Sequence, residues 1–175
     1  MGMTKTFYFI KKDEYTAEEI EKKVKELSAC RVYFSQELKW LPIYSLNFCE
    51  GCDHVNKGFM QNLQEIFGKP ILSFSVFDSD FLSTAICKDG EIYQYACMAS
   101  DIAEDFTAID EYSEELPEFL CDYGIGYEQL EEIWEDEEVV FEEDRLGELV
   151  KLLGTILVCD EDDEIEHILC LSSEK

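Results

Sequence analysis

Alternating apolar and polar residues mark several predicted strands in the first part of the chain. Alternation rich in aromatic and β-branched side chains predicts strands over residues 4–11 and 31–34. Residues 40–48 are apolar but include Pro42, which cannot donate a hydrogen bond to a sheet, so we expect an edge strand or an extended connection there. Residues 71–77 are apolar except for Ser73 and Ser75, which is typical of a buried strand.

Helices are predicted where apolar residues recur every three or four positions. The sequence Thr16-Ala17-Glu18-Glu19 has the capping-box pattern, in which a hydroxyl and a carboxylate accept hydrogen bonds from free backbone N–H groups. The stripe that follows consists of three apolar residues, Ile20, Val24 and Leu27. A second helix is expected over residues 56–67, with Gly68 at its C-terminal end.

An Asp-Gly pair predicts a β-hairpin over residues 81–98. The apolar runs 81–87 and 92–98 flank the short sequence Lys88-Asp89-Gly90-Glu91. Asp-Gly is favoured in two-residue hairpin loops because both residues adopt a positive φ readily.

After residue 98 the pattern changes to short amphipathic helices separated by acidic links. We expect helices over residues 114–123, 127–134 and 141–153, the last one ending at Gly154. A final hairpin is predicted from the apolar stretches 155–159 and 165–171.

These elements predict one α+β domain over residues 1–175. Neither an internal repeat nor a linker rich in Gly, Ser or Pro divides the chain. We expect an antiparallel or mixed sheet with an acidic helical segment, about residues 101–154, packed on it.

Acidic and basic residues are distributed very unevenly along the chain. The chain has 41 Asp and Glu against 14 Lys and Arg, a formal net charge of −27, yet 46% of its residues are apolar, enough for a core. Residues 1–100 hold 14 acidic and 11 basic side chains, whereas residues 101–175 hold 27 and 3. Direct binding to nucleic acid or to an anionic membrane is not expected, because both would be repelled.

Apolar stretches and cysteines indicate a cytoplasmic protein. The apolar stretch 6–10 lies between lysines and is too short for a secretory signal, and no run approaches the ~20 apolar residues of a membrane span. Most of the eight cysteines lie inside apolar stretches at irregular spacing. This spacing favours buried thiols in a reducing compartment over a disulfide framework.

Cys49-Glu50-Gly51-Cys52, followed by His54, is the one local motif with a chemical mechanism. Its place before a predicted helix suits a redox dithiol, and the order of elements resembles a thioredoxin-like arrangement. However, flanking carboxylates oppose thiolate formation, and the proline that this family places opposite its dithiol is missing. Alternatively, Cys49, Cys52 and His54 supply three ligands of a zinc site that lacks an evident fourth. The favoured interpretation is an ordinary loop with two thiols and no metal.

Other catalytic motifs are weak or missing, so an enzyme is not favoured. The chain has two histidines, and His167 is expected to be structural, on a strand. The sequence contains no phosphate loop, no GxSxG and no dinucleotide-binding fingerprint. Asp78-Ser79-Asp80 is more typical of a turn whose Asp side chains accept hydrogen bonds from its own backbone than of a cation site. Residues 160–164 lack the spacing of a calcium loop.

The acidic C-terminal part is the preferred candidate for function. Aromatic residues interleave with its carboxylates, and any that are exposed would form a contact site for a basic protein. We predict eight partner-binding residues: Trp134, Glu135, Asp136, Glu137, Glu138, Asp160, Asp162 and Asp163. The alternative is a solvated acidic face with no specific partner.

Residues 71–154 resemble small acidic bacterial proteins of the immunity type, which neutralise a toxin domain. The similarity rests on the FDSD turn at Phe77–Asp80, the Asp-Gly hairpin and the late helix FEEDRLGELVKLLG at Phe141–Gly154. It implies binding rather than catalysis and transfers no individual site residue. We therefore expect a protein that binds a basic partner, as an inhibitor or immunity protein.

Overall fold

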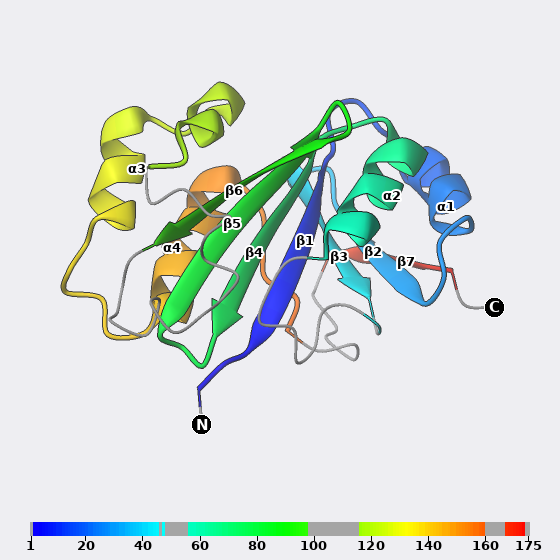
Figure 1. Cartoon of the computed structure of the whole chain (residues 1–175). Helices are drawn as coiled ribbons and strands as arrows, with labels where there is room; N and C mark the ends of the chain where they lie inside the picture. Colours follow the sequence, from blue (N-terminus) through cyan, green and yellow to red (C-terminus); the bar gives the residue numbers. More distant parts are fainter. Residues whose placement is uncertain (1, 46, 48–55, 98–115, 160–166, 174–175) are drawn as a thin grey trace.

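In the computed structural model, the described strands form a single antiparallel sheet (Figure 1). The structure describes residues 2–45, 47, 56–97, 116–159 and 167–173. Within these residues seven strands lie in the order β6-β5-β4-β1-β3-β2-β7. Their bounds are β1 Lys5–Lys11, β2 Cys30–Phe34, β3 Trp40–Ser45, β4 Ile71–Phe77, β5 Phe81–Lys88, β6 Glu91–Cys97 and β7 Leu169–Ser172. The α+β prediction is confirmed, and the sheet is antiparallel rather than mixed.

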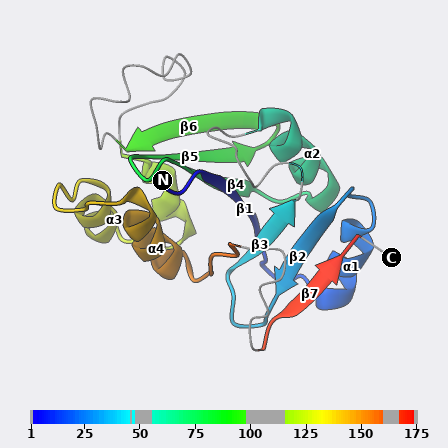
Figure 2. The same ribbon diagram turned by 90° about the horizontal axis from the view of Figure 1, so that it is seen from below.

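Helices cover both faces of this sheet, and Figure 2 shows α1 and α2 on one side of the molecule and α3 and α4 on the other. Helices α1 (Ala17–Val24) and α2 (Lys57–Phe67) pack on one face. The 3-10 helix η3 (Glu118–Tyr123) and helices α3 (Tyr127–Trp134) and α4 (Glu142–Leu153) pack on the other. Within the described residues no helix is long and apolar enough to cross a membrane.

The central strand β1 explains why the sheet is buried on both sides. Tyr8 and Ile10 belong to the core beneath α1 and α2, whereas Phe7 and Phe9 belong to the core beneath α3 and α4. Side chains alternate between the faces of a strand, so a run of apolar residues supplies both cores.

Local signals in the sequence produce the expected helix ends and turn. Both hydrogen bonds of the capping box join Thr16 and Glu19 at the start of α1. Gly68 ends α2 with a φ of 65°, which an L side chain adopts only at a cost. Asp89 and Gly90 have φ values of 54° and 82° and connect β5 to β6, which confirms the hairpin.

Strand β3 is an interior strand, so the prediction of an edge strand or a connection is wrong. It lies between β1 and β2. Pro42 pairs with Phe9 of β1, but the ladder with β2 covers only Ser45 to Ile43. The missing N–H of Pro42 is therefore tolerated, because the pairing with β2 stops at Ile43 and does not include Pro42.

The predicted final hairpin is also wrong. Residues 155–159 form no strand, and β7 pairs with β2 instead. Ile156 packs against the core beneath α1 and α2, and Leu157 against the core beneath α4, so the alternating apolar pattern reflects contacts with both cores. His167 is exposed in a turn with a φ of 67° rather than on the expected strand. Cys170 lies on strand β7 but is exposed, not buried as expected for most of the cysteines.

Candidate functional site

The helices on the second face carry a concentrated negative charge. We call residues 116–153, which comprise η3, α3, α4 and their connections, the acidic layer. It contains thirteen acidic side chains and two basic ones. Eleven of the acidic side chains are exposed, Glu143 is half-buried, and only Glu142 is buried. The negative charge therefore faces solvent rather than the sheet.

Both basic residues of the acidic layer are paired within it. Arg145 is 4% exposed, and its Nε donates to Oε2 of Glu142 at 2.8 Å. Lys151 forms an exposed ion pair with Glu148, with 2.6 Å between Nζ and Oε1. The remaining carboxylates consequently receive no compensating charge from this layer.

Arg145 also attaches the acidic run Glu135–Glu138 to helix α4. Its guanidinium donates to the carbonyl oxygens of Trp134 at 2.9 Å and Asp136 at 2.7 Å, and also to that of Ile133. Burial raises the pKa of the Glu142 carboxyl, and the Arg145 guanidinium opposes this shift. Five donors in a planar fork allow one arginine to satisfy carbonyls and a carboxylate together.

The Asp78-Ser79 turn positions the start of α4. Ser79 Oγ donates to Oε1 of Glu143 at 2.8 Å, and the Ser79 carbonyl accepts from the Glu142 N–H at 2.9 Å. The turn also binds the N-terminal segment, because Ser79 Oγ accepts from the Met3 N–H at 2.7 Å. These contacts give the FDSD sequence a structural role between β4, β5 and α4.

Three large apolar side chains are exposed on the acidic layer. They are Tyr127, Val140 and Phe141, with 48%, 74% and 51% of their surface exposed. Trp134, predicted as a partner-binding residue, is 5% exposed and packs in the core beneath the layer. The α3 stripe turns Trp134 toward the sheet, which leaves it little surface for a partner, while Tyr127 at the start of the helix faces solvent.

A groove of about 520 Å³ runs between α3 and α4. Five of the side chains that line it are carboxylates: Glu132, Asp136, Glu143, Asp144 and Glu148. Ile133, Val139 and Leu152 add apolar surface. The groove therefore combines negative charge with apolar contact area.

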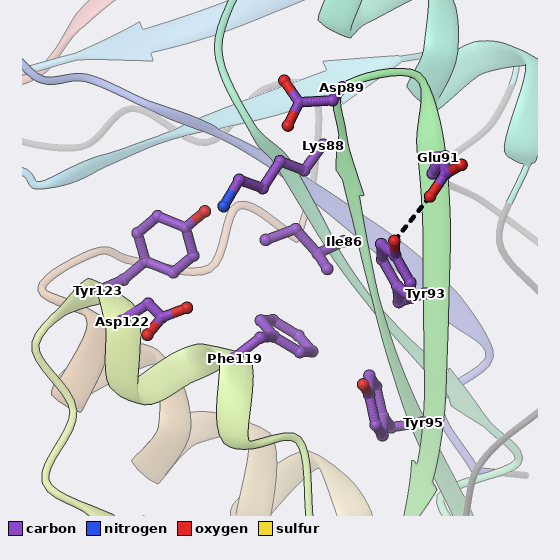
Figure 3. A pocket seen from close by; sticks show the side chains of 9 residues that line it. All are labelled: Ile86, Lys88, Asp89, Glu91, Tyr93, Tyr95, Phe119, Asp122 and Tyr123. Atoms are coloured by element: carbon purple, nitrogen blue, oxygen red, sulfur yellow. Dashed lines mark hydrogen bonds between the residues drawn. The ribbon is translucent and has the colours of Figure 1, made fainter.

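A second pocket, of about 350 Å³, lies where the β5–β6 hairpin meets η3 (Figure 3). Four aromatic rings line it, those of Tyr93, Tyr95, Phe119 and Tyr123, together with the apolar side chain of Ile86. The charged lining residues are one lysine and three acids, namely Lys88, Asp89, Glu91 and Asp122. Sequence reasoning missed this pocket, because its residues come from three elements that meet only in the folded chain.

Hydrogen bonds and ring contacts hold the walls of this pocket. The rings of Tyr95 and Phe119 lie 5.3 Å apart, which joins β6 to η3. The Tyr93 hydroxyl donates to Oε2 of Glu91 at 2.7 Å, and this hydrogen bond raises the pKa of Tyr93. Burial, and next the charge of Asp122, raise the pKa of Tyr123.

The other predicted site residues lie outside the described residues. They are the partner-binding candidates Asp160, Asp162 and Asp163 and the candidate redox or zinc residues Cys49, Cys52 and His54. Among the residues that the structure does describe, no group of three His, Cys, Asp or Glu side chains could hold a metal ion.

Comparisons with protein families, curated proteins and solved structures give no match for this chain. The resemblance to immunity-type proteins therefore stays a prediction. What supports a function is the geometry of the acidic layer and of its neighbouring pocket.

Proposed function

We propose that this protein acts by binding a basic protein partner through its acidic layer. The observation that carries the proposal is the charge of that layer, thirteen acidic against two basic side chains, with both basic ones paired inside it. A surface left without its own counter-charges favours a partner that supplies them.

The exposed position of the carboxylates suits fast association. Glu135, Asp136, Glu137 and Glu138 are all exposed on the connection from α3 to α4. Negative potential over such a surface steers a cationic partner toward it and raises the association rate in a salt-dependent way.

Apolar residues within the layer supply contact area that charge alone lacks. Val140 and Phe141 lie just after the acidic run, separated from it by Val139, and Tyr127 begins the helix that precedes it. Aromatic and apolar anchors surrounded by charge are common at the energetic centres of protein interfaces.

The form of binding that we propose is inhibition, as in an immunity protein. If the partner acts on nucleic acid, carboxylates of the layer would occupy positions where its cationic groups bind phosphates. A cytoplasmic location is part of the proposal. It is supported by Cys30, Cys87, Cys121 and Cys170, four described cysteines that are free thiols.

Affinity capture tests the proposal. The purified protein, immobilised, should retain a basic protein from a lysate of the source cells at low salt and release it at high salt. Capture should fail for an acidic-run variant with four substitutions, Glu135→Gln, Asp136→Asn, Glu137→Gln and Glu138→Gln.

A charge-matched control variant separates the acidic run from net charge. It neutralises four exposed glutamates outside the acidic layer, with Glu14→Gln, Glu26→Gln, Glu37→Gln and Glu65→Gln. This control variant should still retain the partner. Absence of any retained basic protein at either salt concentration would contradict the proposed function.

A further inference from the structure

The pocket between the β5–β6 hairpin and η3 has the composition of a site for an organic cation. Aromatic rings line it from β6 and from η3, with Tyr93 and Tyr95 on the strand and Phe119 and Tyr123 on the helix. The faces of such rings carry negative electrostatic potential and attract cations.

The charges around these rings leave a net negative pocket. Asp89, Glu91 and Asp122 outnumber the single ammonium of Lys88, which forms no ion pair with the described part of the chain. The acids also act on the tyrosines: Asp89 and Asp122 both contribute to the raised pKa of Tyr123. An anionic ligand is disfavoured there, and a cation is favoured.

We infer that this pocket binds the side chain of an arginine on the basic partner, an inference that rests on the proposed function. A guanidinium is planar, stacks on aromatic rings, is weakly hydrated and forms paired hydrogen bonds with a carboxylate. The cavity of about 350 Å³ lies at the small end of ligand pockets, which suits one long side chain. Ile86 and Phe119 offer apolar surface to the methylene groups of the arginine.

The position of the pocket connects it to the surface of the proposed function. Helix η3 supplies Phe119, Asp122 and Tyr123 to the pocket and also opens the acidic layer. One partner can therefore place an arginine in the pocket while its other basic residues face α3 and α4.

A titration with a small probe tests the inference without the partner. Nα-acetyl-arginine N-methylamide is added to the full chain, and the ring resonances of Tyr93, Tyr95, Phe119 and Tyr123 are followed by NMR. Saturable shifts of these rings are expected. The citrulline analogue, which has the same shape without the charge, should cause none.

Substitutions that keep the walls of the pocket intact sharpen the test. Asp122→Asn should weaken probe binding about twofold to fivefold, the size expected for one exposed charge pair. Lys88→Gln should strengthen binding, because it removes the one cation that competes with the probe. The matched control is Glu128→Gln, an exposed carboxylate of the same layer that does not line the pocket, and it should leave binding unchanged.

The outcomes separate this inference from the proposed function. Equal shifts with arginine and citrulline, shifts with acetyl-glutamate instead, or weaker binding after Lys88→Gln would overturn the arginine site. None of these results would affect partner capture by the acidic run. Conversely, pocket-specific shifts combined with failed partner capture would overturn the proposed function. The pocket would then be a site for an arginine-like cation that does not come from a captured partner protein.

Discussion

At the scale of single residues, helix α4 contains two ion pairs of equal spacing and very different surroundings. Arg145–Glu142 is 4% and 2% exposed, and Lys151–Glu148 is 72% and 57% exposed. Arg145→Met should lower the free energy of unfolding by about 3–5 kcal/mol, because it leaves Glu142 buried without its partner. Lys151→Met should cost at most about 1 kcal/mol, since exposed pairs contribute little. Urea denaturation of both variants checks this, and equal losses would contradict the structural role of Arg145.

The capping box at Thr16 predicts a pH dependence with a defined sign. Hydrogen bonds from Thr16, first from its backbone N–H, lower the pKa of Glu19 below 4.5. A carboxyl whose pKa falls on folding stabilises the folded state when ionised, so its contribution is present above pH 4.5 and is lost as pH falls through the lowered value.

The difference in unfolding free energy between the natural chain and Glu19→Gln should therefore shrink on acidification below this range. Urea denaturation across the pH range measures it. Glu18→Gln serves as the control, because Glu18 is a neighbouring carboxylate outside the capping box. A difference for Glu19→Gln that grows as pH falls would contradict the assigned sign.

At the scale of elements, two glycines of α4 should respond to alanine in opposite directions. A Cβ at Gly147, inside the helix, meets nothing within 4 Å, so Gly147→Ala should stabilise the protein by about 0.5–1 kcal/mol through helix propensity. Gly154 ends the helix with a φ of 67°, and Lys39 Cδ would lie 3.1 Å from a new Cβ, so Gly154→Ala should destabilise. Thermal unfolding compares the two. Destabilisation by Gly147→Ala would indicate a contact that the structure lacks.

Elements defined by adjacent residues could be predicted from the sequence, whereas the pairing of strands far apart in the chain could not. The capping box, the Asp-Gly turn and Gly68 each act within a few residues, and all appear as expected. Strand β7 pairs with β2, far away in the sequence, and this choice depends on the assembled sheet. The segment 155–159 imitates a strand because its apolar residues are divided between two cores.

The candidate site also has one feature that the sequence predicts, its charge, and others that depend on how the chain folds. Charge counts alone indicated the acidic layer, because eleven of its thirteen carboxylates are exposed. The burial of Trp134 and the exposure of Phe141 depend on which side of each helix meets the sheet. The aromatic pocket has only a partial signal in the sequence, the i, i+2 pair Tyr93 and Tyr95 on one face of β6.

At the scale of the whole molecule, the net charge of −27 should make stability depend on salt. Raising the ionic strength from about 0.01 M to 0.15 M shortens the screening length from about 30 Å to 8 Å and weakens the repulsion among carboxylates. The free energy of unfolding should rise across this range. The rise should be smaller in the acidic-run variant, which carries four fewer charges. A fall with added salt would show that attractive pairs outweigh the repulsion.

The central claim is that exposed carboxylates of the acidic layer recruit a basic protein. Its most direct test is the association rate constant with the captured partner, measured for the natural chain, the acidic-run variant and the control variant at about 0.05 M and 0.5 M salt. We predict a rate about tenfold or more lower at high salt for the natural chain, and a similar loss at low salt for the acidic-run variant alone. Rates that are independent of salt, or equal losses in both variants, would contradict the claim.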